Sequence, residues 1–166
     1  ILNSGNITYT ANNDNPIIIK VSGGGFSSPY YNFEDENGNS IDIYNGGFVF
    51  MRGKTYEFQA NGINSTHPFK IVYNKGQTST STISGNSGSL TVTMATDDDN
   101  NSYYQCDEHP TSMQGNLQFL YGTVNSVDYN FYYGDIDVTV NGDFNQASVY
   151  CLYHGYMGGE NLLVYN

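Results

Sequence analysis

The chain has 166 residues, enough for one ordinary domain or one domain with a small extension, and too few for two full-sized cores. It carries 16 Asp and Glu residues against 5 Lys and Arg residues, a formal net charge of -11, so nucleic acid and anionic membrane surfaces would be repelled. No apolar run approaches the roughly 20 residues that cross a bilayer. The sequence therefore predicts a protein that binds no nucleic acid and does not span a membrane.

The residue composition favours an all-β fold. The chain contains 16 Tyr, 9 Phe and 19 Gly, and only 13% of its residues are charged. Aromatic residues suit a half-buried pleated surface, and glycine suits the tight turns between strands. The low content of charged residues argues against long surface helices, whose exposed faces are usually rich in Lys and Glu.

Short apolar or alternating runs separated by turn residues predict many short strands, as in a sandwich or barrel. In the run 55–60 the aromatic residues fall on one face, and in the run 135–140 the aliphatic residues do. The Ser-, Thr- and Gly-rich run 76–89 is expected to form a long mobile loop. In chain order, the predicted strands are 7–9, 17–21, 40–44, 48–51, 55–60, 69–73, 90–94, 102–106, 117–121, 129–133, 135–140, 147–151 and 162–165.

One pattern occurs twice in the second half of the chain. Each copy is an aromatic strand that ends at a cysteine, followed by a loop with a histidine and a methionine, and then by Asn-Leu. The chain has only 2 Cys and 3 His, and both cysteines and two of the histidines fall in these copies. The first copy contains Cys106, His109 and Met113, and the second contains Cys151, His154 and Met157.

Thiolate, imidazole and thioether groups are the ligands of a type 1 copper site, which uses two histidines, one cysteine and a distant methionine. The loop Cys106 to Met113 supplies three of these groups. A second imidazole must come from another strand, and His67 is the candidate because it begins a predicted strand well upstream.

These runs resemble those of the cupredoxin family of blue copper proteins. The run RGKTYEF at 52–58, followed by HPF at 67–69, is similar to the strand pair that delivers the first copper histidine, and the loop 106–113 looks like the closing ligand loop. The resemblance implies that His67 and His109 are imidazole ligands, that Cys106 is the thiolate and that Met113 is the weak axial ligand. The run YHGYMGG at 153–159 is similar to the closing loop of cupredoxin-like modules in large surface proteins of marine microbes and their viruses.

The resemblance implies a Greek-key β-sandwich or barrel over residues 1–122. Residues 123–166 would then form a C-terminal β extension with an added hairpin, packed on the same domain and carrying the loop with Cys151, His154 and Met157. It also implies a copper-binding module for electron transfer or copper handling, with a redox partner, at an extracellular, cell-surface or virion-surface location.

Other interpretations of the same residues stay open. Cys106 and Cys151 are candidates for a disulfide in a metal-free structural or adhesive module that contacts neighbouring subunits of a filament, virion or cell-surface layer. Alternatively, both loops together would hold a copper pair, or a Met-rich cluster would store or deliver Cu(I). An enzyme is not expected, because three isolated histidines cannot build the oxygen-reducing cluster of a multicopper oxidase and no Gly-x-Ser-x-Gly motif occurs.

Overall fold

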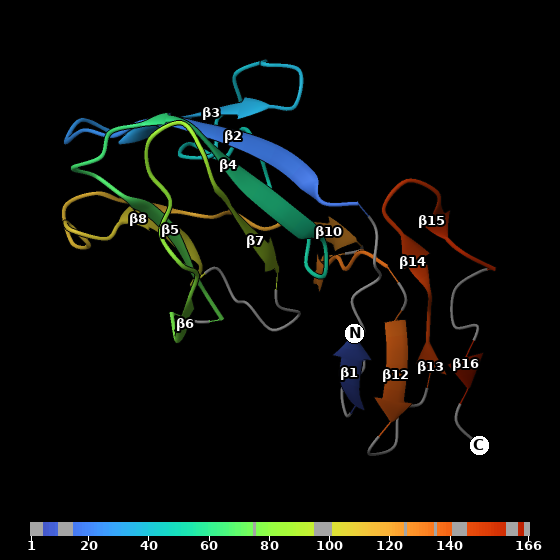
Figure 1. Cartoon of the computed structure of the whole chain (residues 1–166). Coiled ribbons are helices and arrows are strands. Elements are labelled where there is room, and N and C mark those ends of the chain that lie inside the picture. Colours follow the sequence, from blue (N-terminus) through green and yellow to red (C-terminus); the bar gives the residue numbers. More distant parts are fainter. Residues whose placement is uncertain are drawn as a thin grey trace.

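The computed structural model describes residues 5–9, 15–74, 76–94, 101–124, 126–134, 136–140, 146–158 and 163–164. Within these ranges the regular structure is entirely β, which confirms the predicted all-β class (Figure 1). The same ranges contain no helix that is long and apolar enough to cross a membrane.

The first four-stranded sheet has the order β3-β2-β4-β7. It consists of β2 (Ile17–Gly23), β3 (Tyr31–Asp35), β4 (Thr55–Ile63) and β7 (Ser89–Thr93). The pair β2 and β4 is parallel, whereas β3 and β7 run antiparallel to their neighbours. The strands predicted at 17–21, 55–60 and 90–94 are confirmed by this sheet, and β3 was not predicted.

The second four-stranded sheet is antiparallel, with the order β6-β5-β8-β9. It consists of β5 (Phe69–Tyr73), β6 (Thr78–Ser79), β8 (Tyr103–Cys106) and β9 (Gln114–Asn116). The predicted strands at 69–73 and 102–106 correspond to β5 and β8. The β5–β8 register places Phe69 opposite Cys106, so the segment that precedes β5 lies beside the segment that follows β8.

The two sheets pack against each other through aromatic side chains. Phe69 of β5 lies 5.7 Å from Phe58 of β4 and 5.1 Å from Tyr31 of β3, measured between ring centroids. Phe33 of β3 and Tyr104 of β8 are 5.0 Å apart, edge to face. Such pairs add about 0.5–1.5 kcal/mol to the free energy gained from burial alone. This two-layer arrangement is the frame that positions the segments next to β5 and β8 (Figure 1).

Gly115 lies so close to the buried ring of Tyr104 that an added Cβ would overlap the ring carbons and the hydroxyl oxygen. Tyr104 is held in place because its hydroxyl donates a hydrogen bond to the carbonyl of Pro29 at 2.7 Å. We therefore expect Gly115→Ala to lower the free energy of unfolding by about 1–3 kcal/mol, the usual cost of overpacking. Urea denaturation measures this, with Gly25→Ala as the control because its Cβ would meet nothing within 4 Å. Equal stabilities of the two variants would contradict the packing argument.

Buried tyrosines give the fold an alkaline limit. Burial raises the pKa of Tyr56 from 10.0 to about 12, and burial also raises the pKa of Tyr31 and of Tyr104. Above about pH 10 the unfolded chain therefore loses these protons before the folded chain does. The contribution of the three tyrosines to the free energy of unfolding is fully present below pH 10 and is lost as the pH rises through their pKa values in the folded protein.

The free energy of unfolding, measured in urea at a series of pH values, is expected to be level up to about pH 9 and to fall steeply above pH 10. Tyr56→Phe should make this fall less steep, whereas Tyr153→Phe should not, because Tyr153 is 81% exposed. An unchanged pH profile for Tyr56→Phe would refute this explanation.

The remaining strands form two-stranded pairs beside the sheets (Figure 1). The C-terminal region meets the sandwich at a parallel bridge between Arg52 and Tyr132, and the amide of Tyr133 donates to the Arg52 carbonyl at 2.8 Å. The first strand pairs with a strand of the expected extension rather than with a sandwich sheet. The pairs are β1 (Gly5–Tyr9) with β12 (Ile136–Val140), β10 (Tyr121–Val124) with β11 (Val127–Asn130), β13 (Gln146–Ala147) with β16 (Leu163–Val164), and β14 (Tyr150–Cys151) with β15 (Gly155–Tyr156).

The strand predicted at 40–44 is wrong. The segment forms turns because the Asp42 side chain accepts hydrogen bonds from the backbone and side-chain nitrogens of Asn45, at 3.0 and 3.1 Å. The carbonyl of Asp42 also accepts from the amide of Phe48 at 2.8 Å. This turn chemistry of aspartate overrides the alternating apolar pattern.

Two further predicted strands, 48–51 and 117–121, meet in a single β-bridge, and of their residues only Tyr121, which begins β10, lies in a strand. Phe50 and Phe119 form one parallel bridge, and the amide of Phe50 donates to the carbonyl of Gln118 at 2.7 Å. The segments thus run side by side only briefly, and both phenylalanines are buried in the core.

The predicted mobile loop 76–89 is tied to both sheets instead. Ile83 is buried and exchanges two backbone hydrogen bonds of 2.9 Å with Phe69. Gly85 accepts and donates in the same way with Ile63 at 2.8 Å, and β6 lies within this run. Its Ser and Gly content led to the loop prediction, but the buried Ile83 anchors it.

Candidate metal centre

His67 is held in a tight turn directly before β5. The Asn64 carbonyl accepts a hydrogen bond from the His67 amide at 2.9 Å, and the Asn64 side chain accepts from the Thr66 amide at 3.1 Å. The Asn64 amide in turn donates to the Gly23 carbonyl at 2.6 Å. The turn is therefore fixed to the end of β2, and the imidazole of His67 is buried with it.

Cys106, His109 and Met113 lie on the loop that joins β8 to β9. Cys106 is the last residue of β8, and its amide donates to the Met113 carbonyl at 3.0 Å. The Met113 amide donates to the His109 carbonyl at 3.1 Å, which closes the loop on itself. These backbone bonds fix where each side chain begins.

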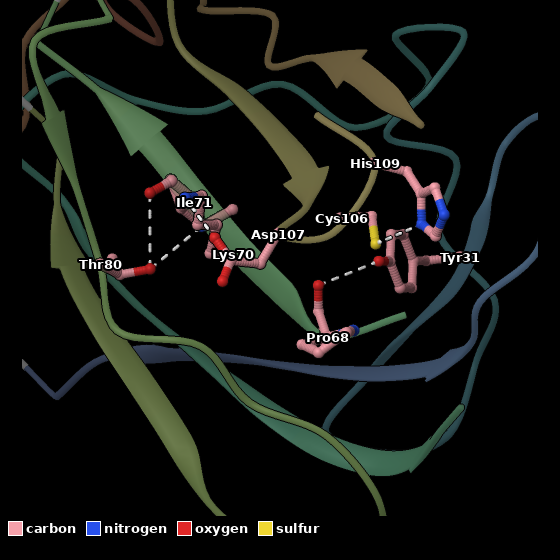
Figure 2. Close-up of polar contacts among 8 residues, drawn as sticks. All are labelled: Tyr31, Pro68, Lys70, Ile71, Thr80, Cys106, Asp107 and His109. Atoms are coloured by element: carbon pink, nitrogen blue, oxygen red, sulfur yellow. Dashed lines mark hydrogen bonds and ion pairs between the residues drawn. The ribbon is translucent and has the colours of Figure 1, made fainter. Parts of the chain in front are cut away.

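The structure brings three of the predicted ligands together. The Cys106 sulfur lies 3.6 Å from Nδ1 of His109 and 3.8 Å from Nδ1 of His67, and the two Nδ1 atoms are 3.3 Å apart. Among the described residues, His67, Cys106 and His109 form a group of three His, Cys or acidic side chains whose donor atoms are close enough to hold a metal ion. The His67 nitrogen and the Cys106 sulfur, from segments far apart in the sequence, thus lie close together, and Figure 2 shows Cys106 beside His109.

The dimensions of this triangle match those of a metal site. An ion that binds nitrogen at ~2.0 Å and sulfur at ~2.3 Å, with angles between tetrahedral and trigonal, requires N–N separations of about 3.3–3.6 Å and N–S separations of about 3.5–3.8 Å. The three observed separations, 3.3, 3.6 and 3.8 Å, all fall in these ranges. The three donor atoms therefore lie at separations that suit a metal ion.

The donor atoms also favour a cation on chemical grounds. Two imidazole nitrogens and one sulfur face one another, and a neutral imidazole offers one lone pair and one N–H. Cys106 is fully buried, so water cannot solvate its sulfur. Lone pairs that converge in a buried place are stabilised by a shared proton or a shared cation.

Met113, the fourth predicted ligand, is paired with Cys106 through the backbone. The register pairs Gln105 with Gln114, so Met113 lies opposite Cys106, and side chains of opposed residues project to the same face. Met113 is fully buried and belongs to the same core cluster as Cys106. Its role as an axial ligand stays a prediction.

Tyr31 contacts the backbone next to the centre and was not identified from the sequence. Its hydroxyl donates to the carbonyl of His67 at 3.0 Å, and Figure 2 shows the same hydroxyl directed at the Pro68 carbonyl, 3.4 Å away. Burial, followed by the neighbouring Cys106 thiol, raises the pKa of Tyr31. Tyr31 thus positions the His67 backbone and lies beside the sulfur.

A glycine-rich loop covers the outer side and was also missed. Phe26 is 62% exposed, and its ring meets the rings of His67 and His109 at right angles, with centroids 5.1 and 5.0 Å away. Gly24 has a φ of 112°, and a Cβ there would lie 3.1 Å from the His67 Cβ. The three successive glycines before Phe26 were the signal in the sequence, since they permit a close backbone approach.

The acidic residues next to Cys106 do not belong to the cluster. Asp107 forms an ion pair with Lys70 at 2.6 Å on the outer face of the sheet (Figure 2), and its amide donates to the Pro68 carbonyl at 2.9 Å. Glu108 is exposed. The donor set is therefore sulfur and nitrogen, the soft and borderline ligands that suit copper or zinc.

The second predicted loop lies on the hairpin β14–β15. The Cys151 sulfur is 3.4 Å from Nδ1 of His154, the same pair of atoms and the same sequence spacing as in the first loop. His154 is exposed and Met157 is 46% exposed. This loop thus presents its groups to solvent instead of burying them.

The two loops do not combine. Both cysteines are free, so the structure lacks the Cys106–Cys151 disulfide considered above. The buried cluster contains no residue of the second loop, and β8 and β14 lie at opposite sides of the molecule in Figure 1. A copper pair shared by both loops is therefore not formed among the described residues.

Comparison of the chain with protein-family models, with curated proteins and with solved structures found no match.

Proposed function

We propose that the chain is a copper-binding module of Greek-key, cupredoxin-like fold, in which one copper ion is held by His67, Cys106, His109 and Met113 and serves electron transfer. The observation that carries this proposal is the triangle of one sulfur and two Nδ1 atoms with edges of 3.3, 3.6 and 3.8 Å. Together with a buried methionine opposite the cysteine, this is the donor set of a type 1 site.

Each residue would have a separate task. His67 and His109 would bind through Nδ1, and Cys106 would bind as a thiolate after its proton leaves. Bound copper would supply one-electron redox chemistry at this position. Tyr31 holds the His67 carbonyl in place, and Phe26 reduces the access of water to both imidazoles.

Rigidity favours electron transfer over copper storage. His67 lies in the hydrogen-bonded turn before β5, Cys106 ends the adjacent strand β8, and His109 is fixed by the closed loop. A site on rigid elements keeps one geometry in both oxidation states, so little rearrangement accompanies the transfer of an electron.

A metal titration followed by voltammetry tests the proposal. The reduced protein is expected to bind one equivalent of Cu(II) at this site, to turn intensely blue, and to show a reversible one-electron wave. Binding without a reversible wave would indicate copper handling instead of electron transfer. Failure to bind copper would contradict the proposal and favour the alternative function, a metal-free surface module.

That second candidate is favoured by exposed aromatic side chains. Tyr121 is 70% exposed and Tyr153 is 81% exposed, and both follow β9, the last strand of the two four-stranded sheets. Tyrosine is enriched where proteins contact one another. A surface-located module that binds neighbouring subunits through this region is compatible with a copper site at the opposite side.

We expect Phe26→Ala to make bound copper easier to remove. The ring shields both imidazoles, and the apolar shell of a metal site controls the access of solvent. The rate at which a chelator extracts the metal, followed by the loss of colour, should rise by up to about 10-fold. Tyr121→Ala is the control because it removes an aromatic ring of similar exposure elsewhere, 70% against 62%. Equal extraction rates for the two variants would show that Phe26 does not shield the site.

A further inference from the structure

Cys151 and His154 repeat the geometry of the buried centre at the surface. Both loops place a cysteine three residues before a histidine, with the sulfur facing Nδ1 at 3.6 Å in the first loop and at 3.4 Å in the second. A coincidental contact of an exposed histidine would not be expected to reproduce both the atom and the distance. The second loop thus holds two donor atoms, the Cys151 sulfur and the His154 Nδ1, at a fixed separation, which we call its bite.

The size of this bite sets the coordination that it can provide. Two ligands on opposite sides of an ion would place sulfur and nitrogen about 4.3 Å apart, whereas a bent arrangement needs about 3.5 Å. The observed 3.4 Å therefore leaves the remaining positions of the ion open on the solvent side. A third ligand must come from a nearby side chain or from outside.

Two methionines lie in the same part of the molecule as Cys151. The β14–β15 register pairs Tyr150 with Tyr156 and Cys151 with Gly155, and the Met157 amide donates to the Val149 carbonyl at 2.9 Å. Because side chains alternate along a strand, Met157 projects to the same face of the hairpin as Cys151. Met51 and Cys151 also both line one cavity of about 280 Å³.

We propose that Cys151 and His154 form a second, solvent-accessible site for a soft metal ion, Cu(I), completed by Met157 or by an external ligand. Thiolate and thioether ligands select Cu(I), and binding releases the thiol proton of Cys151 to solvent. The open positions allow an incoming thiol to exchange for the ion, which suits a site of capture or delivery. This goes beyond the electron-transfer site and does not depend on it.

Anaerobic titration with Cu(I), in competition with a chromogenic Cu(I) chelator, tests the proposal on the full chain. The wild-type protein is expected to bind one equivalent more than Cys151→Ser and one more than His154→Ala, which means two against one when the buried centre is also filled. The matched variant Cys106→Ser should keep the Cys151 site and also bind one. Two equivalents retained by Cys151→Ser, or copper bound to Cys151 only in dimers of the chain, would overturn the proposal.

Alkylation of the native wild-type protein gives a second readout that needs no variant. Cys106 is buried and Cys151 is partly exposed, so a thiol reagent should modify Cys151 first, as read by mass spectrometry. One equivalent of Cu(I) beyond that bound at the buried centre is expected to protect Cys151. Unchanged alkylation of Cys151 in Cu(I), or protection by Zn(II) but not by Cu(I), would overturn the assignment.

Discussion

Replacement of Cys106 by serine is expected to abolish the blue colour of the copper-loaded protein and to weaken copper binding by more than about 100-fold, because changes outside the direct ligands already cost 10–100-fold. The colour of a type 1 site arises from the bond between thiolate and copper, and a serine hydroxyl is a hard, protonated group that replaces it poorly. Visible absorption during a Cu(II) titration measures the colour, and competition with a chelator measures the affinity.

Cys151→Ser is the matched control, since it changes the same side chain in the second loop. Copper at the buried centre should stay blue in this variant, because the Cys106 sulfur faces His67 and His109 and no residue of the second loop. A blue Cys106→Ser protein, or a colourless Cys151→Ser protein, would show that the copper thiolate is Cys151 and not Cys106.

Phe69→Ala should cause the largest loss of stability, about 3–5 kcal/mol in the free energy of unfolding of the metal-free protein. The ring is fully buried and contacts rings from both sheets. Its partners are Tyr31, Phe33, Phe58 and Tyr104. The substitution therefore opens a cavity where the two layers meet, directly beside the segment that carries His67.

Urea denaturation measures this loss, and Phe26→Ala serves as its control. Phe26 is 62% exposed, so its removal should change the stability of the metal-free protein by no more than about 0.5 kcal/mol. A loss below about 1 kcal/mol for Phe69→Ala would mean that the sheets do not depend on this contact.

Alternation of apolar residues predicted some of the strands that build the core but not β3, which contributes Tyr31 and Phe33. It located β4 and β7 because one face of each is buried and the other is wet. The same alternation was misleading at 40–44, where hydrogen bonds to the Asp42 side chain form turns. Pairing partners were beyond the sequence, and so was the parallel contact between β2 and β4, because register depends on packing between distant segments.

The candidate centre was predictable as far as its chemistry is local. Cys106 and His109 were identified by their Cys-x-x-His spacing, which recurs at Cys151 and His154. His67 lies 39 residues away from Cys106 and meets it only through the β5–β8 register. Phe26 and Tyr31 could not be assigned in the same way, because an aromatic residue carries no sign of which imidazole or carbonyl it will contact.

The most direct test is a crystal structure of the protein loaded with one equivalent of Cu(II), with the metal located by its anomalous scattering. One copper peak is expected between Nδ1 of His67, Nδ1 of His109 and the sulfur of Cys106, at ~2.0 Å from the nitrogens and ~2.3 Å from the sulfur. Copper bound away from these three atoms, or a Cys106 sulfur bonded to Cys151, would contradict it.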